Sequence, residues 1–245
     1  MLLVERGLVE SRAKAAARIM AGEVVVDDQR VDKPGTKVSA DAAIRLKGEA
    51  QPWVSRGGLK LEGALARWPT EVSGAVCVDV GASTGGFTHV LLESGAARVY
   101  AIDVGYGQLH WSLRTDARVV NMERTHIKSL EKGALSPAPT IAVVDVSFIS
   151  LTLVLPALVP HLAEGARVYA LIKPQFEVGR AHVGKGGIVR DDAARDDAIA
   201  RVLARAEEVS LVLVGIDESP IRGADGNIEK IAAFDFHGAK LDVTD

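Results

Sequence analysis

Cysteine and long apolar runs are both scarce in this 245-residue chain. The single cysteine, Cys77, excludes an intramolecular disulfide and is typical of a protein in a reducing cytoplasm. The longest apolar stretch, residues 148–163, is interrupted by prolines and is shorter than the roughly 20 residues needed to span a bilayer. Acidic side chains lie near the N-terminus where a secretory signal has an apolar core. We therefore expect a cytoplasmic protein with no membrane span.

Net charge is also small, but the charges are unevenly distributed. The whole chain carries −3, yet Lys and Arg outnumber Asp and Glu in residues 1–60, so the remainder is more acidic. A basic segment is a modest indication of polyanion binding. The composition, 48% hydrophobic and 25% charged, is that of an ordinary globular protein, and the length allows two domains of unequal size.

The first 47 residues predict a small module of two helices and a hairpin. We expect helices at 2–7 and 11–22, the second capped by Ser11 and stopped by Gly22. A tight hairpin at 24–31 and a third strand ending near Leu46 follow. We therefore predict domains at 1–47 and 58–245, joined by a polar connection at 48–57.

The stretch SRAKAAARIMAGEVVVDDQRVDKPGTKV resembles the S4-type RNA-binding domain. The resemblance implies that basic side chains of this module contact RNA phosphates. The alternative is that each lies on a solvated charged face. The candidate RNA-binding residues, which include one in the connection, are Arg12, Lys14, Arg18, Lys33 and Arg56.

From Val76 onward, strand-like and helix-like runs alternate, after an amphipathic helix at 59–68. Alternation of this kind favours a mostly parallel, doubly wound α/β sheet with helices on both faces. The last two strands have no convincing helix between them, so we expect an antiparallel edge. Predicted strands are 76–80, 98–103, 118–121, 141–146, 167–172, 210–214 and 231–236; predicted helices are 87–94, 108–114, 151–162 and 191–208.

The stretch VCVDVGASTGGFT, residues 76–88, predicts a buried strand that runs into a glycine-rich turn and then a helix. In a doubly wound sheet, this first turn is the usual cofactor site. The next strand ends in Asp103, whose carboxylate can accept the hydroxyls of a nucleoside ribose. These features fit either a dinucleotide or S-adenosylmethionine.

Charged residues are predicted at the ends of further strands. Asp145 ends the fourth strand, Lys173 ends the fifth, and Glu229 precedes the last, while Lys60 lies near the start of the helix that follows SRGG. Buried charges cost desolvation free energy unless they are paired or functional. A structural ion pair between Asp145 and Lys173 is the alternative interpretation.

Lys60, Asp145, Lys173 and Glu229 together resemble the Lys-Asp-Lys-Glu tetrad of FtsJ-like ribose 2′-O-methyltransferases. The ordered motifs SRGGLKL, DVGASTGGFT, AIDVGYGQL, DVSFISL, LIKPQFE and GNIE are similar to the TlyA family of ribosomal RNA 2′-O-methyltransferases, historically labelled haemolysin A. This similarity extends over essentially the whole chain. His126 stands where the family pattern has asparagine, which leaves the adenine contact within residues 123–126 open.

The resemblance implies a Rossmann-like methyltransferase sheet, mostly parallel with one antiparallel strand, and S-adenosylmethionine as cofactor. The partner it implies is ribosomal RNA or a ribosomal subunit, methylated on a cytidine; no metal is required. Residues implied at the cofactor pocket are Asp79, Gly81, Ser83, Gly85, Phe87 and Asp103.

Within the tetrad, Lys173 is the candidate base or the group that orients the hydroxyl. An unperturbed lysine has a pKa of ~10.4, so a base role requires a depressed pKa. A second cation at Lys60 would lower the pKa of Lys173, whereas the negative charge of Asp145 would raise it. Glu229 would position Lys60. Two alternatives remain: a nicotinamide-dependent oxidoreductase, and a non-catalytic RNA-binding or haemolysin-like protein.

Overall fold

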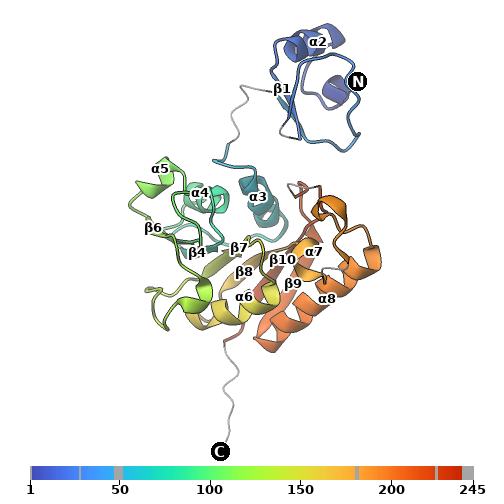
Figure 1. Cartoon of the computed structure of the whole chain (residues 1–245). Coiled ribbons are helices and arrows are strands. Elements are labelled where there is room, and N and C mark those ends of the chain that lie inside the picture. Colours follow the sequence, from blue (N-terminus) through green and yellow to red (C-terminus); the bar gives the residue numbers. More distant parts are fainter. Residues whose placement is uncertain (1, 28, 47–51, 180–181, 224–225, 239–245) are drawn as a thin grey trace, which may run out of the picture. The chain divides into compact units, whose positions relative to one another are not determined.

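The computed structural model describes residues 2–27, 29–46, 52–179, 182–223 and 226–238 (Figure 1). The chain divides into two compact units, Met1–Pro52 and Trp53–Asp245. The division falls inside the connection predicted at residues 48–57, of which 48–51 lie outside the described residues. Each unit has its own apolar core.

The N-terminal unit packs two helices against a three-stranded antiparallel sheet with the order β2-β1-β3. The hydroxyl of Ser11 accepts a hydrogen bond from the Lys14 amide, as expected of an N-cap. Gly22 adopts a φ of +67° just beyond the helix end. Its elements are α1 (Leu2–Glu5), α2 (Arg12–Met20), β1 (Val24–Val26), β2 (Gln29–Val31) and β3 (Ile44–Leu46).

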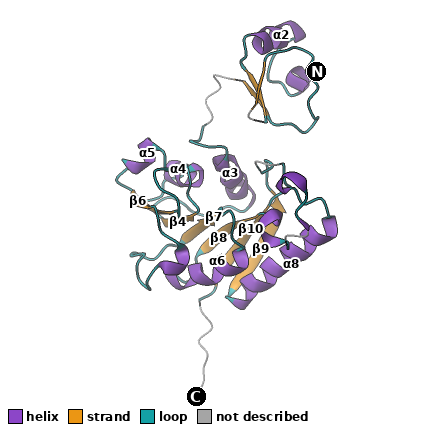
Figure 2. Ribbon diagram, in the orientation of Figure 1, coloured by secondary structure: helices purple, strands orange, loops and turns teal. Residues whose placement is uncertain are grey.

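The C-terminal unit is built on a seven-stranded sheet with the order β6-β5-β4-β7-β8-β10-β9 (Figure 2). Strands β4 to β8 are parallel, and β10 is antiparallel to both neighbours, which confirms the predicted sheet and its antiparallel edge. The strands are β4 (Val76–Val80), β5 (Arg98–Ile102), β6 (Val119–Met122), β7 (Ile141–Val144), β8 (Arg167–Ile172), β9 (Leu211–Glu218) and β10 (Lys230–Phe236).

Helices cover both faces of this sheet because successive strand residues face opposite sides. Val78 and Val80 join the core under α6 and α8, whereas Cys77 joins the core under α3 and α4. The helices are α3 (Gly57–Arg67), α4 (Gly86–Glu93), α5 (Trp111–Arg114), α6 (Leu151–Leu158), α7 (Pro174–Glu177) and α8 (Asp192–Glu208). Within the described residues, no helix has the length and apolarity needed to cross a bilayer.

Several predicted helices are shorter than the sequence pattern indicated. Those predicted at 2–7 and 11–22 span only Leu2–Glu5 and Arg12–Met20, and two in the C-terminal unit differ as well. The helix predicted at 108–114 begins only at Trp111, because the ring of His110 accepts the amide of Ser112 and caps the helix there. The helix predicted at 151–162 ends as an α-helix at Leu158 and continues as a 3₁₀ turn, η2 (Val159–His161). Pro160 lacks the amide that would continue the α-helical pattern.

Candidate active site

The loop after β4 requires glycine at two positions. Gly81 has a φ of +87°, and a Cβ there would collide with the backbone carbonyl of Asp145. Gly85 has a φ of +95° at the start of α4, and a Cβ there would collide with the side chain of Leu113. L-residues with a side chain rarely adopt such backbone angles. The loop therefore packs closely on the end of β7 and presents its backbone to the space above the sheet.

Asp79 lies beneath this loop and is fully buried. Burial raises the pKa of its carboxyl to about 7; a hydrogen bond from Thr88 opposes the rise and the nearby charge of Asp145 adds to it. The Thr88 hydroxyl donates to Asp79 Oδ2 at 2.7 Å. Asp79 lines neither of the two cavities at this end of the sheet. Its hydrogen bond with Thr88 joins the end of β4 to α4 on either side of the loop, so its contribution to a cofactor pocket would be through loop shape.

Two cavities adjoin along the carboxyl ends of the parallel strands. The first, of about 440 Å³, contains Lys60, Phe87 and Lys173 in its walls. The second, of about 450 Å³, contains Asp103 and His126. Four residues line both cavities and mark their junction: Gly81, Ser83, Asp145 and Ser147. Together the cavities provide one continuous candidate site, located where ligands bind in doubly wound sheets.

Asp103 connects the loops that follow β4 and β5. Its Oδ2 accepts the amide of Ser83 and its Oδ1 accepts the amide of Gly105, each at 2.7 Å. A carboxylate has about four acceptor sites, so two remain for ligand hydroxyls. This geometry is compatible with the ribose contact that the sequence predicts.

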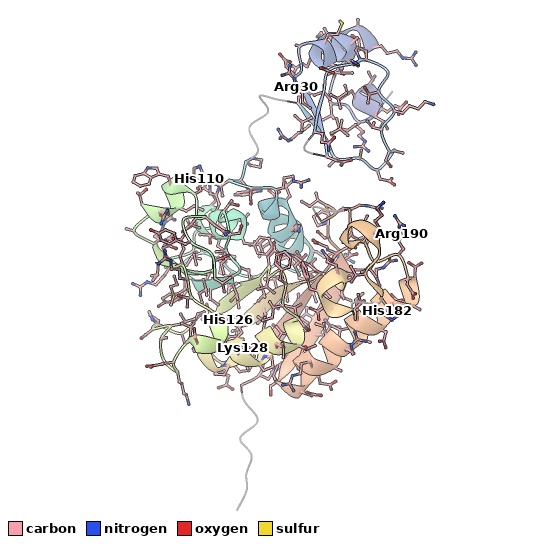
Figure 3. All side chains as sticks on the ribbon, viewed as in Figure 1. Arg30, His110, His126, Lys128, His182 and Arg190 are labelled. Atoms are coloured by element: carbon pink, nitrogen blue, oxygen red, sulfur yellow. The ribbon has the colours of Figure 1, made fainter. Side chains whose placement is uncertain are left out.

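Glu123 and His126 have different surroundings. Glu123 accepts the amides of Gln108 and Leu109 at 3.0 and 3.3 Å, pairs with Arg114, and lines neither cavity. His126 lines the second cavity, and its Nδ1 accepts the amide of Lys128 at 3.1 Å at the start of a 3₁₀ turn (Figure 3). Asparagine commonly performs this capping role, so histidine preserves the local backbone.

The four tetrad residues form two ion pairs around the first cavity. On α3, Lys60 Nζ donates to Glu229 Oε2 at 2.6 Å, and the two residues are only 8% and 2% exposed. Lys173 Nζ, just beyond β8, lies 2.6 Å from Asp145 Oδ1, just beyond β7. Glu229 lies behind Lys60, whereas the other three residues line the cavity.

Lys173 has a second partner that sequence reasoning missed. Its ammonium donates a hydrogen bond to Ser147 Oγ at 3.0 Å, while its contact with Asp145 is a close ion pair without hydrogen-bond alignment. An ammonium carries three N–H donors. Asp145 and Ser147 thus fix the direction of Lys173 at the junction of the two cavities.

The predicted RNA contacts lie on both units. In the N-terminal unit the side chains of Arg12, Lys14, Arg18 and Lys33 are exposed. Lys14 pairs with Glu10, and Arg18 lies 3.9 Å from Glu23. Arg56 belongs to the C-terminal unit, where it lines the first cavity.

Two further cavity residues were absent from the predicted site. Phe148 lines the second cavity, is 91% exposed and has a φ of +65°. Its ring centre lies 5.1 Å from that of Phe176. Arg222 lines the first cavity from the loop between β9 and β10. Phe148 lies three residues after Asp145 within DVSFISL, and this closeness to a predicted site residue could have identified it. No such feature of the sequence indicated Arg222.

Both units of the chain match known protein families. Residues 53–236 match the family described as FtsJ-like methyltransferase, and residues 1–44 match the S4 domain. The chain therefore belongs to the FtsJ-like methyltransferase family, and the predicted two-part resemblance is confirmed.

Particular relatives place the chain more narrowly. It is 49% identical to the 16S/23S rRNA (cytidine-2′-O)-methyltransferase TlyA of Mycobacterium tuberculosis, over 93% of this chain and 85% of the relative. It is 41% identical to Hemolysin A of Brachyspira hyodysenteriae, over 93% of this chain and 95% of the relative. A solved hemolysin-type protein of Streptococcus thermophilus is 45% identical, with a TM-score of 0.77 over 99% of this chain and 89% of that one. The predicted TlyA resemblance is confirmed.

Proposed function

We propose that the protein transfers a methyl group from S-adenosylmethionine to the ribose 2′-hydroxyl of a cytidine in ribosomal RNA. The observation that carries this proposal is the convergence of the two ion pairs, Lys60–Glu229 and Lys173–Asp145, on a cavity that continues into the one beside Asp103. The substrate is supported by the M. tuberculosis relative, which is described as acting on cytidine in 16S and 23S rRNA.

The two cavities suit the two parts of the reaction. The second cavity would hold the nucleoside of the cofactor, with Asp103 on its ribose. The first, walled by Gly81, Ser83 and Phe87, would hold the methionine end and the acceptor ribose. The glycine loop lies between them, so the methyl group would be presented beside Lys173.

Alignment and proton handling are the tasks left to the protein, because the sulfonium methyl is already activated. Lys173, directed by Asp145 and Ser147, would hold the 2′-oxygen in line with the methyl group. When bound, S-adenosylmethionine would supply the activated methyl group and leave as S-adenosylhomocysteine. The proton of the 2′-hydroxyl would pass through Lys173 to the carboxylate of Asp145, because an ammonium can accept a proton only as it gives one up. Glu229 would keep Lys60 in the opposite wall of the cavity. A ribosomal substrate would also place the protein in the cytoplasm.

Nucleotide-resolution mapping of ribose methylation tests the proposal. Ribosomal RNA from cells with and without the protein should differ at one or more cytidines, and the purified protein should restore the modification with S-adenosylmethionine. Calorimetry should detect binding of S-adenosylmethionine and none of a nicotinamide dinucleotide. Identical methylation maps, or binding of the dinucleotide alone, would contradict the proposal.

The N-terminal unit supplies the second part of the proposal, which is RNA binding through its exposed cations. Reversing two of them, in the double variant Arg12→Glu, Arg18→Glu, should weaken RNA affinity at least about tenfold, because each attraction to a phosphate is replaced by a repulsion. S-adenosylmethionine affinity should not change. Filter binding at several salt concentrations measures the first quantity and calorimetry the second.

The matched control reverses Arg98 and Lys132, two exposed cations that line neither cavity. This control alters net charge by the same amount, so it separates a local contact from a general electrostatic effect. Equal RNA affinity in the two double variants would contradict the proposal that Arg12 and Arg18 bind RNA.

A further inference from the structure

Arg222 lies in the loop between β9 and β10 and has no part in the two ion pairs of the site. Together with Ile221 it lines the first cavity, which residues of the glycine loop also line. Its side chain is exposed, and it forms no hydrogen bond or ion pair with any other residue that the structure describes. The cavity wall thus carries a guanidinium without a protein partner among those residues.

The loop that carries Arg222 is fixed at both ends. The Ser219 amide donates to the Glu229 carbonyl at 2.9 Å, and the Gly223 amide donates to the Asn227 carbonyl at 3.0 Å. Asn227, only 2% exposed, also accepts the amide of Val189 through its side chain. These hydrogen bonds anchor the backbone at residues 219 and 223, on either side of Arg222.

Gly223 ties the position of Arg222 directly to the tetrad. A Cβ on Gly223 would collide with Oε1 of Glu229, whose Oε2 accepts from Lys60 at 2.6 Å. The backbone beside Arg222 therefore rests against the carboxylate that positions Lys60. The backbone of Arg222 is therefore held next to the Lys60–Glu229 pair, in the cavity where the acceptor ribose would lie.

The charge balance of the cavity favours an anionic ligand at Arg222. The charges of Lys60 and Lys173 are already compensated by Glu229 and Asp145. Arg222 adds a positive charge with no such compensation among the described residues. Guanidinium groups bind phosphate and carboxylate through paired N–H donors. The candidate ligands are a backbone phosphate of the RNA and the carboxylate of the cofactor.

Strand order favours the phosphate. The cavity that contains Asp103 lies over β5, β4 and β7. Lys173 follows β8, and the loop of Arg222 joins β9 and β10, beyond β8 in the sheet. Arg222 is thus on the side of Lys173 away from the cofactor's nucleoside. An RNA strand that presents a 2′-hydroxyl to Lys173 carries phosphates on both sides of that ribose.

We infer that Arg222 binds a backbone phosphate next to the methylated ribose and so sets the position of the RNA strand in the cavity. This inference rests on the proposed function and adds a substrate-binding residue to it. The chemistry of the contact is independent of base identity, so Arg222 contributes affinity and alignment, and other residues contribute sequence choice.

Steady-state kinetics of Arg222→Gln, Arg222→Lys and the control Arg98→Gln, on ribosomal RNA, test the inference. For Arg222→Gln, KM for RNA should rise roughly 10- to 100-fold. The slope of log KM against log salt should become shallower by about 0.7 to 0.9, the value for one phosphate contact. Arg222→Lys should keep the wild-type salt slope, because it retains the charge. Arg98→Gln, at the start of β5 and outside both cavities, should match the wild type.

The salt slope distinguishes contact with phosphate from a merely structural role. A folded Arg222→Gln variant with an unchanged slope would overturn the inference, as would loss of S-adenosylmethionine affinity by calorimetry, which would assign Arg222 to the cofactor carboxylate. If the wild type itself transferred no methyl group to RNA, the proposed function would fail and this inference with it. An active wild type with an unaffected variant would overturn the Arg222 assignment alone.

Discussion

Replacing Lys173 with alanine is expected to abolish detectable methyl transfer, lowering turnover at least about 100-fold. The reason is positional: Lys173 is held between Asp145 and Ser147 at the junction of the two cavities, where the acceptor oxygen and the methyl group would meet. Affinity for S-adenosylmethionine should change little, because the predicted cofactor contacts come from the loops after β4 and β5. Single-turnover transfer of a labelled methyl group and calorimetry measure the two quantities.

Lys230 provides a control for this substitution. It is also a lysine near the active-site end of β10, but it lines neither cavity. Its Nζ lies 3.9 Å from Oε2 of Glu218. Lys230→Ala should retain wild-type turnover. Thermal denaturation of both variants verifies that they are folded. Turnover of folded Lys173→Ala equal to that of the wild type would contradict the role assigned to Lys173.

Replacing Glu229 with leucine is expected to lower the free energy of unfolding by about 3–5 kcal/mol. The Lys60 side chain is only 10% exposed, and its ammonium hydrogen-bonds to Glu229, so the substitution leaves a buried charge without its partner. Methyl transfer should fall as well, since Lys60 lines the first cavity. Urea denaturation measures the loss of stability.

The double variant Lys60→Met, Glu229→Leu separates stability from function. Replacing both members of a buried ion pair with apolar residues of similar volume is often neutral or stabilising. The double variant should therefore recover most of the unfolding free energy lost in Glu229→Leu, while methyl transfer stays low. If it were no more stable than the single variant, Lys60 and Glu229 would not be energetically coupled as the 2.6 Å contact implies.

The sequence predicted correctly those features that depend on interactions between residues close together in the chain. Strand β4 has the predicted bounds, and Ser11 caps α2, because apolar patterning and capping depend on neighbours a few residues away. The helix predicted at 108–114 begins three residues later, at Trp111, because the His110 ring caps it there. The pattern was right about the alternation of elements and less accurate about where they begin and end.

By itself, the sequence determined the class of fold, the glycine loop and the residue types of the tetrad. Only the tertiary structure decided how those residues pair: Lys60 reaches Glu229 across 169 positions, and Lys173 takes Ser147 as a second partner. It also placed Asp79 beneath the loop and Arg222 in the cavity wall. Local patterns reflect contacts within one helix or strand, whereas these placements depend on strand order and loop closure, which bring distant residues to one edge of the sheet.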